Sequence, residues 1–381
     1  MLASLMYPMI KLVKAGVSVD RLKEYINWNI FEKPFSTPEA PSPDWPTRGS
    51  IKATNLSIRY RKGLPLVLKG VNFDIKPGEK VAFIGRTGSG KSTTLLALMR
   101  ILEMAKDERG TALGSLEIDG QNIAHIGLHQ LRGRVGIIPQ DPYLFEGTLR
   151  FNLDPSEAHT DEELIDRLKA VSVLDTIKSE DLINQRIKEL KEKAQTKFKS
   201  LKKEKQEEIV EKFGSADEYI QTTENFDLDP QIARIKEQGA TNADKLKFKL
   251  EGKGVNLSIG QRQLVCIARA LVDKPKIFLM DEATANIDQK TDSIIQGLIK
   301  STLTDTTVVT IAHRLLTIIQ YDKVVVLEEG RKVEQGSPSE LLEKDGGFFW
   351  GLVKEGGEEF FGKMKQAAGD WSIDPAELFA E

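Results

Sequence analysis

The stretch VAFIGRTGSGKST, from Val81 to Thr93, decides the fold of this chain. It opens with a short apolar run of the kind that is buried in a parallel sheet. A glycine-rich loop follows and fits the pattern G-x-x-x-x-G-K-[ST] in the strand–loop–helix context that this pattern requires. Glycine lets the backbone curl so that successive N–H groups point toward a bound phosphate. The sequence therefore predicts a phosphate-binding site built from Gly85, Arg86, Thr87, Gly88, Ser89, Gly90, Lys91, Ser92 and Thr93.

Two carboxylates follow another apolar run, KIFLMDE, which ends in Asp281 and Glu282. Taken alone, an Asp-Glu pair after a strand indicates a solvated strand end. Beside a phosphate loop the pair is expected to hold Mg²⁺ and to handle the attacking water. We expect Lys91 to reach the β- and γ-phosphates, Ser92 and Asp281 to ligate Mg²⁺, and Glu282 to polarise the water.

Two further polar residues end apolar strands. Gln140 follows GIIP and His313 follows VVTIA. The carboxyl ends of parallel strands are where ligands bind in open α/β sheets. We expect Gln140 to complete the contacts to Mg²⁺ or water, and His313 to donate to the γ-phosphate. The other histidines lack such placement, and we assign no role to His125, His129 or His159.

The strand pattern around these residues predicts an α/β fold. Short strands are expected in 51–60, 66–75, 81–85, 135–140, 276–282, 307–313 and 323–330, with a hairpin around Asp119-Gly120. Helices are expected between them, the first from Lys91 to about Met104. Such alternation is typical of a largely parallel sheet with crossover helices. The tail after Gly336 predicts two short helices, with GGFFWGLV covering the sheet.

Three segments differ from this pattern. Residues 1–28 predict a helix with one apolar side, and five prolines between Pro34 and Pro46 predict an extended linker. From about 181 to 248 the chain is rich in Lys and Glu, and its apolar residues from Ile183 to Leu201 recur at helical spacing. We interpret this part as a long solvated helix followed by short helices and loops. A short coiled-coil contact is the alternative.

The composition is that of an ordinary globular protein of 381 residues with a formal net charge of −3, which gives no reason to expect nucleic acid as a partner. The single cysteine, Cys266, excludes a disulfide framework and fits a reducing compartment. No apolar run reaches the length of about 20 residues that spans a bilayer. We expect this chain by itself to be soluble and cytoplasmic.

The motifs, in their order along the chain, resemble the ATP-binding cassette (ABC) family. They are GRTGSGKS, Gln140, LSIGQ (Leu257–Gln261), IFLMDE, NID (Asn286–Asp288) and His313. The resemblance covers Ile51 to about Leu342 apart from the charged segment. Tyr60 matches the aromatic residue that stacks on adenine in this family. The stretches IIPQDPYLFEGTLRFNLDP and VDRLKEY look like the second nucleotide-binding domain of subfamily C, the multidrug-resistance-associated transporters.

This resemblance implies a P-loop NTPase core of mostly parallel sheet and helices, with an antiparallel β subdomain and a helical subdomain. Residues 1–28 would trail from a transmembrane domain, and 29–50 would be the linker. The nucleotide-binding domain would span 51–345, with the helical subdomain at about 141–272 and a charged helical insertion at about 181–248. Residues 346–381 would form a helical tail. The insertion is expected to be a solvated excursion, with partner docking as the alternative.

The mechanism that the resemblance implies is a head-to-tail sandwich of two such domains. ATP on the phosphate loop of one domain is capped by the Ser258, Gly260 and Gln261 segment of the other. Ile259 stands where the family motif has glycine, and Asn286 stands where serine is more usual. The change at Ile259 predicts an asymmetric exporter in which this chain supplies the hydrolysing phosphate loop. Such a chain would work at the cytoplasmic face of a membrane.

Two other classes remain open at this point. One is a soluble ABC-type ATPase that acts on DNA or chromosomes, whose helical insertion is normally a much longer coiled coil. The other is a translation-type ABC protein, which normally carries two cassettes in one chain. The segment VDRLKEY favours the exporter over both.

Overall fold

A six-stranded sheet forms the centre of the molecule in the computed structural model, in the order β12-β11-β3-β10-β9-β6. The structure describes residues 2–27, 41–177, 179–200, 206, 210, 241–281, 289–312, 314–370 and 373. The strands are β3 (Lys80–Ile84), β6 (Val135–Ile138), β9 (Ile277–Asp281), β10 (Thr307–Ile311), β11 (Lys323–Glu328) and β12 (Arg331–Gly336). All neighbours pair in parallel except β12, which pairs with β11 antiparallel at the edge. The predicted, largely parallel sheet is confirmed.

A second, antiparallel sheet packs against the first. It contains β1 (Ile51–Ile58), β2 (Leu68–Ile75), β4 (Ser115–Ile118) and β5 (Gln121–Asn122) in the order β2-β1-β4-β5. A shared apolar core joins the two sheets, and in it Phe73 of β2 meets Phe83 of β3 edge to face at 5.2 Å. The predicted hairpin is present, with its turn at Asp119-Gly120 between β4 and β5.

The carboxylate of Asp119 fastens the chain where it enters β1. It accepts the backbone N–H groups of Arg48, Gly49 and Ser50, and also the Ser50 hydroxyl. Burial alone would raise the pKa of Asp119, but these hydrogen bonds outweigh burial and lower it. The end of the proline-rich segment is therefore pinned to the antiparallel sheet.

The helix after the phosphate loop, α2 (Lys91–Leu98), is shorter than predicted. The sequence suggested a helix to about Met104, but Arg100 takes a left-handed backbone conformation with φ of 48°. The amides of both Ile101 and Leu102 then bond to the carbonyl of Leu96, so the helical ladder stops. The buried guanidinium of Arg100 bonds to the carbonyls of Ile123 and Ile126, which holds this turn in place.

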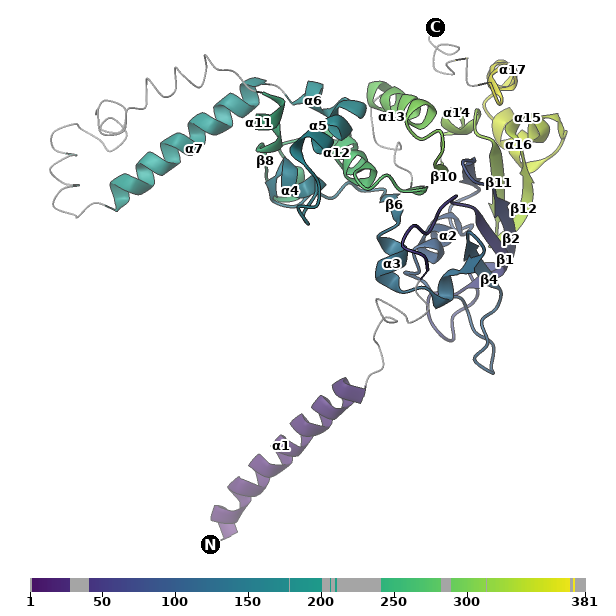
Figure 1. The fold of residues 1–381 in the computed structure, drawn as a ribbon. Coiled ribbons are helices and arrows are strands. Elements are labelled where there is room, and N and C mark those ends of the chain that lie inside the picture. The colour runs from purple at the N-terminus through teal and green to yellow at the C-terminus, as the bar shows by residue number, and fades with distance from the viewer. Residues whose placement is uncertain are drawn as a thin grey trace.

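The helical subdomain lies beyond β6 in Figure 1. Its elements are β7 (Gly147–Thr148), α4 (Leu149–Leu153), α5 (Asp161–Ala170), α6 (Val173–Thr176), α7 (Ser179–Lys199), α11 (Asn242–Leu246), β8 (Lys249–Leu250) and α12 (Ile259–Leu271). Along the chain, the short 3₁₀ turn η1 (Ile123–His125) and the helix α3 (Leu128–Arg132) connect β5 to β6. A second 3₁₀ turn, η2 (Gly252–Gly254), precedes α12. The apolar face of α12 lies in one core with α4, α5 and α6, and Cys266 is buried there as a small apolar side chain.

The charged segment begins with α7, whose first turns are docked and whose far end projects from the subdomain (Figure 1). Leu182 is buried in the subdomain core. The amide of Gln185 donates to the carbonyl of Lys249 at 3.1 Å and accepts its N–H at 3.0 Å, as a neighbouring strand would. The predicted long helix is confirmed to Lys199, while Leu201 and most of 201–240 lie outside the described residues.

Helices after β9 pack on the central sheet together with α12. The helices after β9 are α13 (Gln289–Ser301), α14 (Leu315–Ile318), α15 (Pro338–Glu343), α16 (Phe348–Lys354) and α17 (Glu358–Ala367). Phe349 and Val353 of α16 pack with Ile84 and Val326 of the sheet, as GGFFWGLV predicted. The described residues after Gly336 form three helices, because Ser337 caps an extra helix, α15, that the sequence analysis had not separated.

The first helix, α1 (Leu2–Asn27), bears apolar side chains that are exposed in the structure, among them Met9, Leu12, Val13 and Leu22. The prediction of a helix in residues 1–28 is confirmed for 2–27. Among the described residues, no helix combines the length and the apolar character that crossing a membrane requires.

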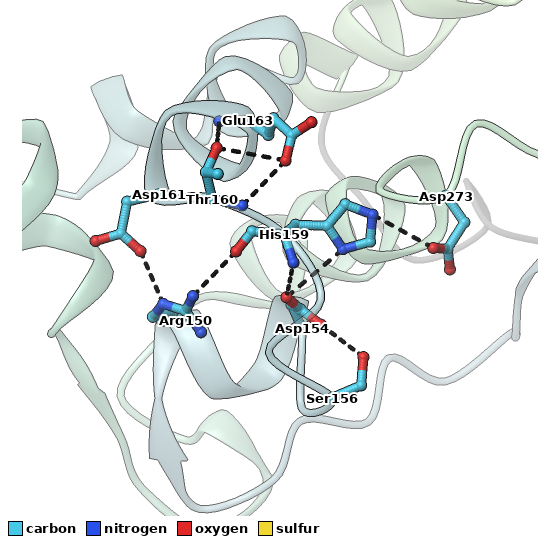
Figure 2. Close-up of polar contacts among 8 residues, drawn as sticks. All are labelled: Arg150, Asp154, Ser156, His159, Thr160, Asp161, Glu163 and Asp273. Atoms are coloured by element: carbon cyan, nitrogen blue, oxygen red, sulfur yellow. Dashed lines mark hydrogen bonds and ion pairs between the residues drawn. The ribbon is translucent and has the colours of Figure 1, made fainter.

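A polar network that the sequence analysis did not foresee fixes the loop between α4 and α5 (Figure 2). The His159 ring lies between the carboxylates of Asp154 and Asp273, with nitrogen–oxygen distances of 3.5 and 3.6 Å. Asp154 is buried and also accepts the His159 N–H and the Ser156 hydroxyl. Because Asp273 follows α12, His159 ties the far end of that helix to the start of α5.

The ionised form of Asp154 should stabilise this subdomain. Burial alone would raise the pKa of Asp154, but the N–H groups of His159 and Ala158 and the Ser156 hydroxyl outweigh it, so the pKa falls below 3.8. A carboxyl with a lowered folded-state pKa contributes stability above its unfolded pKa, and that stability is lost as the pH falls through the folded value. We expect Asp154→Asn to lower the free energy of unfolding by about 2 kcal/mol at pH 7.

The measurement is urea unfolding of both proteins at pH 7 and at steps below pH 4, where the difference should shrink. Asp166→Asn is the matched control, because the Asp166 side chain is 71% exposed and pairs only with Lys169 among the described ion pairs. A difference that stays constant down to the acid limit would show that the charge of Asp154 plays no part.

Candidate nucleotide-binding site

The loop between β3 and α2 has the backbone that the phosphate-binding pattern predicts. Gly85 has φ of 145° and Gly90, the residue that caps α2, has φ of 104°. A Cβ atom on Gly85 would lie 2.1 Å from the carbonyl oxygen of Leu327, and one on Gly90 would lie 2.6 Å from a methyl group of Leu68. Only glycine fits at these two positions, so the tight curl of the loop follows from its packing against β11 and β2.

Lys91 lies beneath this loop. Its side chain is buried, and Nζ donates to the carbonyls of Gly85 at 2.8 Å and Arg86 at 3.1 Å. The Ser89 hydroxyl is also buried and has no hydrogen-bond partner. A cation and an unpaired hydroxyl in a curled loop at a helix N-terminus are suited to an anionic ligand such as a phosphate chain.

Ser92 and Asp281 meet at the end of the sheet, although 189 positions separate them in the chain. The Ser92 hydroxyl lies 3.5 Å from a carboxylate oxygen of Asp281, the last residue of β9. Both are hard oxygen donors of the type that Mg²⁺ prefers. Within the described part of the chain, no cluster of three or more His, Cys, Asp or Glu side chains could hold a metal alone. A divalent cation here would therefore also need oxygens from phosphate or water.

Tyr60 stands at the other side of the loop. Tyr60 is 51% exposed, and its hydroxyl lies 3.4 Å from that of Thr93 in the first turn of α2. An exposed aromatic face beside a phosphate loop can stack on a nucleotide base. Arg86 and Thr87 lie in the exposed part of the same loop, with Gly88 between them and Ser89.

Gln140 follows β6 at the same edge of the sheet as Asp281, because Ile138 of β6 pairs with Met280 of β9. In the next pair of strands, Ile311 of β10 lies opposite Asp281. Glu282 and His313 continue β9 and β10 in sequence, and both lie outside the described residues, as does Asn286. Their assigned roles therefore stay predictions.

The segment from Ser258 to Gln261 forms the start of α12, in a different part of the molecule (Figure 1). The Ser258 hydroxyl accepts the N–H of Gln261 at 3.1 Å, and the Gln261 side chain accepts the N–H of Ser258 at 2.8 Å. This reciprocal capping box holds the turn rigid. Ser258 is exposed, Gly260 is buried, and the side chain of Ile259 is 48% exposed.

The structure thus brings Tyr60, the phosphate loop, Asp281 and Gln140 together and leaves Ser258 to Gln261 apart from them. An exposed edge-to-face pair, Tyr143 and Phe145, lies on the loop after Gln140, with ring centroids 5.4 Å apart. The sequence analysis missed this pair, although two aromatics in a polar loop after a strand were visible in DPYLFEG.

The two-residue strands β7 and β8 were missed as well, since they are too short to leave a pattern. They join the loop after Gln140 to the segment before Ser258. A cavity of about 870 Å³ lies between this strand pair, α7 and Gln261, so the insertion forms a wall beside the start of α12.

A glycine-rich loop that curls over a buried lysine, with a serine and a strand-end aspartate beside it, defines a P-loop nucleotide-binding domain. The sequence profile of the family described as "ABC transporter" matches residues 68–285. This chain belongs to the ABC transporter family, and it is an ATP-binding domain of that family.

Its relatives lie in subfamily C. The chain is 40% identical over 343 residues to ATP-binding cassette sub-family C member 2 of Mus musculus, a match that covers 90% of this chain and 18% of that protein. It is 41% identical over 342 residues to the mouse sub-family C member 3, with the same coverage of both chains. ABC transporter C family member 12 of Dictyostelium discoideum is 39% identical over 342 residues, 90% of this chain and 21% of the relative. The chain thus spans about a fifth of the length of these relatives.

Among solved structures, a bacterial Atm1-family ABC exporter with ATP bound is similar to this chain. The TM-score is 0.64 at 26% sequence identity, and the match covers 91% of this chain and 48% of the exporter chain. The agreement over nine-tenths of the chain supports the α/β architecture described above.

The crowding at Gly85 makes a specific prediction about ATP binding. Gly85→Ala must push the loop away from Leu327, so we expect ATP affinity to fall at least about tenfold, since misplacing several phosphate contacts costs more than 1.4 kcal/mol. Titration of a fluorescent ATP analogue measures this loss. Gly110→Ala is the matched control, because Gly110 also has positive φ, at 84°, but its Cβ would meet nothing within 4 Å. If both variants bound the analogue equally well, the predicted site would be misplaced.

Proposed function

We propose that this chain is the ATP-hydrolysing motor domain of a subfamily C exporter and corresponds to the second nucleotide-binding domain of that protein. The observation that supports this most directly is the pairing of Ser92 with Asp281 beside a curled phosphate loop. That edge of the sheet has the parts for binding a nucleoside triphosphate, while the Ser258 segment lies elsewhere. In this proposal residues 1–28 trail from a transmembrane domain, 29–50 are a linker, 51–345 are the motor domain and 346–381 are its tail.

ATP would bind with its base on Tyr60 and its phosphates in the loop from Gly85 to Thr93. The ammonium of Lys91 would exchange the carbonyls of Gly85 and Arg86 for the β- and γ-phosphate oxygens, a stronger charge-assisted contact. Ser92, Asp281 and Gln140 would hold Mg²⁺ together with phosphate and water oxygens. When bound, Mg²⁺ would neutralise charge on the phosphates.

Hydrolysis would then depend on positioning. Glu282 would orient a water so that its oxygen attacks the γ-phosphorus in line as the bond to the ADP oxygen breaks, and the Glu282 carboxylate would accept the water proton. His313 would donate a hydrogen bond to the γ-phosphate. Little covalent chemistry is required of the protein in such a reaction, so the placement of Glu282 and His313 determines the rate.

The partner in this proposal is the other nucleotide-binding domain of the same transporter, arranged head to tail. The exposed Ser258 hydroxyl and the N-terminus of α12 would face the γ-phosphate of ATP held by that partner. A helix of 13 residues with a complete capping box is a rigid mount for such a contact. Ile259, which is half exposed, would weaken the site that it caps, and the two ATP sites would therefore differ.

Coupling to transport would act through the surface after Gln140. The exposed rings of Tyr143 and Phe145 offer apolar area there, and Arg269 of α12 donates to the carbonyl of Tyr143 at 3.3 Å. Movement of this loop would thus displace α12, the helix that Ser258 caps. In this proposal the transmembrane domains of the parent protein rest on this surface, at the cytoplasmic face of a membrane.

The role of Glu282 can be tested in the full transporter. Glu282→Gln should reduce ATP turnover at least about a hundredfold, because the carboxylate is needed to direct the water, while ATP binding persists. Steady-state ATPase and nucleotide binding are the two measurements. Glu343→Gln, an exposed carboxylate in α15, is the control and should leave both unchanged. Wild-type turnover in Glu282→Gln would exclude the proposed hydrolysing site.

The isolated chain should hydrolyse ATP only where two copies can meet, because each site takes the Ser258 segment from a partner. We expect the specific ATPase activity to be near zero at low protein concentration. It either rises in proportion to concentration as self-dimers form, or remains near zero if the other domain is indispensable. High activity that does not depend on concentration would contradict the sandwich. Tight, salt-sensitive binding of duplex DNA would favour a soluble DNA-acting ATPase instead.

A further inference from the structure

An ion pair joins the starts of α13 and α14, the helices that follow β9 and β10 in the chain. Asp292 is in the first turn of α13, and Arg314 directly precedes α14. Arg314 Nη1 donates to Asp292 Oδ2 at 3.5 Å. The Asp292 side chain is only 16% exposed, whereas that of Arg314 is 42% exposed.

The two residues of the pair are close in sequence to the predicted catalytic residues Glu282 and His313. Asp292 is four residues beyond Asp288, at the far end of the segment that begins with Glu282. Arg314 directly follows His313. The strands that lead into these two segments, β9 and β10, are neighbours, with Asp281 opposite Ile311. The pair therefore joins the first turn of α13, which follows β9 in the chain, to the start of α14, which follows β10.

The surroundings of Asp292 make its partner important. One carboxylate oxygen, Oδ1, is buried without a hydrogen-bond partner, so the charge depends on what reaches the other oxygen. Burial raises the pKa of Asp292, and Gln296 and Arg314 oppose that rise. Nearby, burial raises the pKa of Tyr321 to about 12, so its hydroxyl stays neutral and pairs with that of Thr310 in β10 at 3.1 Å. Arg314 thus compensates a largely buried carboxylate, and removal of Arg314 would leave that charge without this partner.

We propose that Asp292 and Arg314 are positioning residues for ATP hydrolysis, which together hold the first turn of α13 to the start of α14, the described elements that follow Glu282 and His313 in the chain. This inference rests on the proposed function. Neither side chain touches the phosphate loop, Tyr60 or the Ser92–Asp281 pair in the described contacts. The pair should therefore affect the rate of the chemical step and leave ATP binding unchanged.

The test is steady-state ATPase kinetics of the full transporter carrying Asp292→Asn, Arg314→Gln or both. We expect each single variant to lower kcat at least about tenfold, since small displacements of a reacting group have large effects on rate, with KM for ATP within about twofold of wild type. The double variant should be no slower than the slower single variant, because the two residues act as one unit.

Arg314→Lys separates positioning from general stability. The described contact runs from Nη1 of Arg314 to Oδ2 of Asp292, so a lysine ammonium that reaches this oxygen should restore most of kcat. Arg331→Gln is the matched control, because Arg331 is an exposed arginine at the start of β12 and should leave kcat and KM unchanged. Thermal unfolding of every variant accompanies the kinetics.

Three results would overturn the inference. They are unchanged kcat in Arg314→Gln, a loss that appears in KM rather than kcat, and a loss of kcat that follows a loss of thermal stability without rescue by lysine. The Glu282→Gln transporter distinguishes this failure from failure of the proposed function. If Glu282→Gln abolishes turnover and Arg314→Gln does not change it, only the positioning role is wrong.

Discussion

The close approach of the phosphate loop to its neighbours is the constraint on which the rest of the site depends. The backbone at Gly85 runs so near the Leu327 carbonyl of β11, and that at Gly90 so near Leu68 of β2, that neither position has room for a side chain. The loop is therefore packed between β11 of the central sheet and β2 of the antiparallel sheet. Because both sheets share one apolar core, a rigid frame holds the loop's N–H groups and Lys91 in place before any ligand arrives.

The same frame fits the proposal that one chain carries only part of a catalytic apparatus. The strand ends place Asp281 and Gln140 around the loop, whereas the capped start of α12 belongs to a second core, which the helical subdomain shares with Phe278 and Met280 of the central sheet. Because one shared core fixes both parts in place, the proposed mechanism completes each site with the complementary part of another domain. The proposed asymmetry adds a further condition, because the exposed Ile259 would alter the partner's site and leave this chain's own loop unchanged.

The charged insertion is attached through α7 to Lys249 of β8, close to the start of α12. The side chain of Gln185 bonds to both backbone groups of Lys249, and Lys249 also pairs with Glu189 at 2.8 Å. Through β8 and β7, α7 is therefore connected to the loop after Gln140 and to the turn before Ser258. On the sequence alone this segment was expected to be a solvated excursion, with partner docking as the alternative. Its anchoring at the base of α12 is compatible with either interpretation of the part beyond Lys199.

The sequence by itself determined the phosphate loop, the strands that end at Asp281 and Gln140, and the turn at Ser258. Each of these depends on backbone preferences and side-chain alternation over a few contiguous residues, and such preferences can be read locally. Even the meeting of Ser92 and Asp281 followed from the rule that parallel strands end at one edge. The predicted roles of Glu282 and His313 rest on that rule, on the neighbouring phosphate loop and on the resemblance to the family.

Only the tertiary structure decided the early end of α2 at Arg100, the strand pair β7–β8, the contact of Gln185 with Lys249, the setting of His159 between two carboxylates, and the pairing of Asp292 with Arg314. These features join residues whose sequence neighbours look like ordinary helix ends and loops. A buried guanidinium or a shared carboxylate is stabilised by whatever the folded chain brings beside it, and that neighbour is set by the path of the whole chain rather than by local sequence.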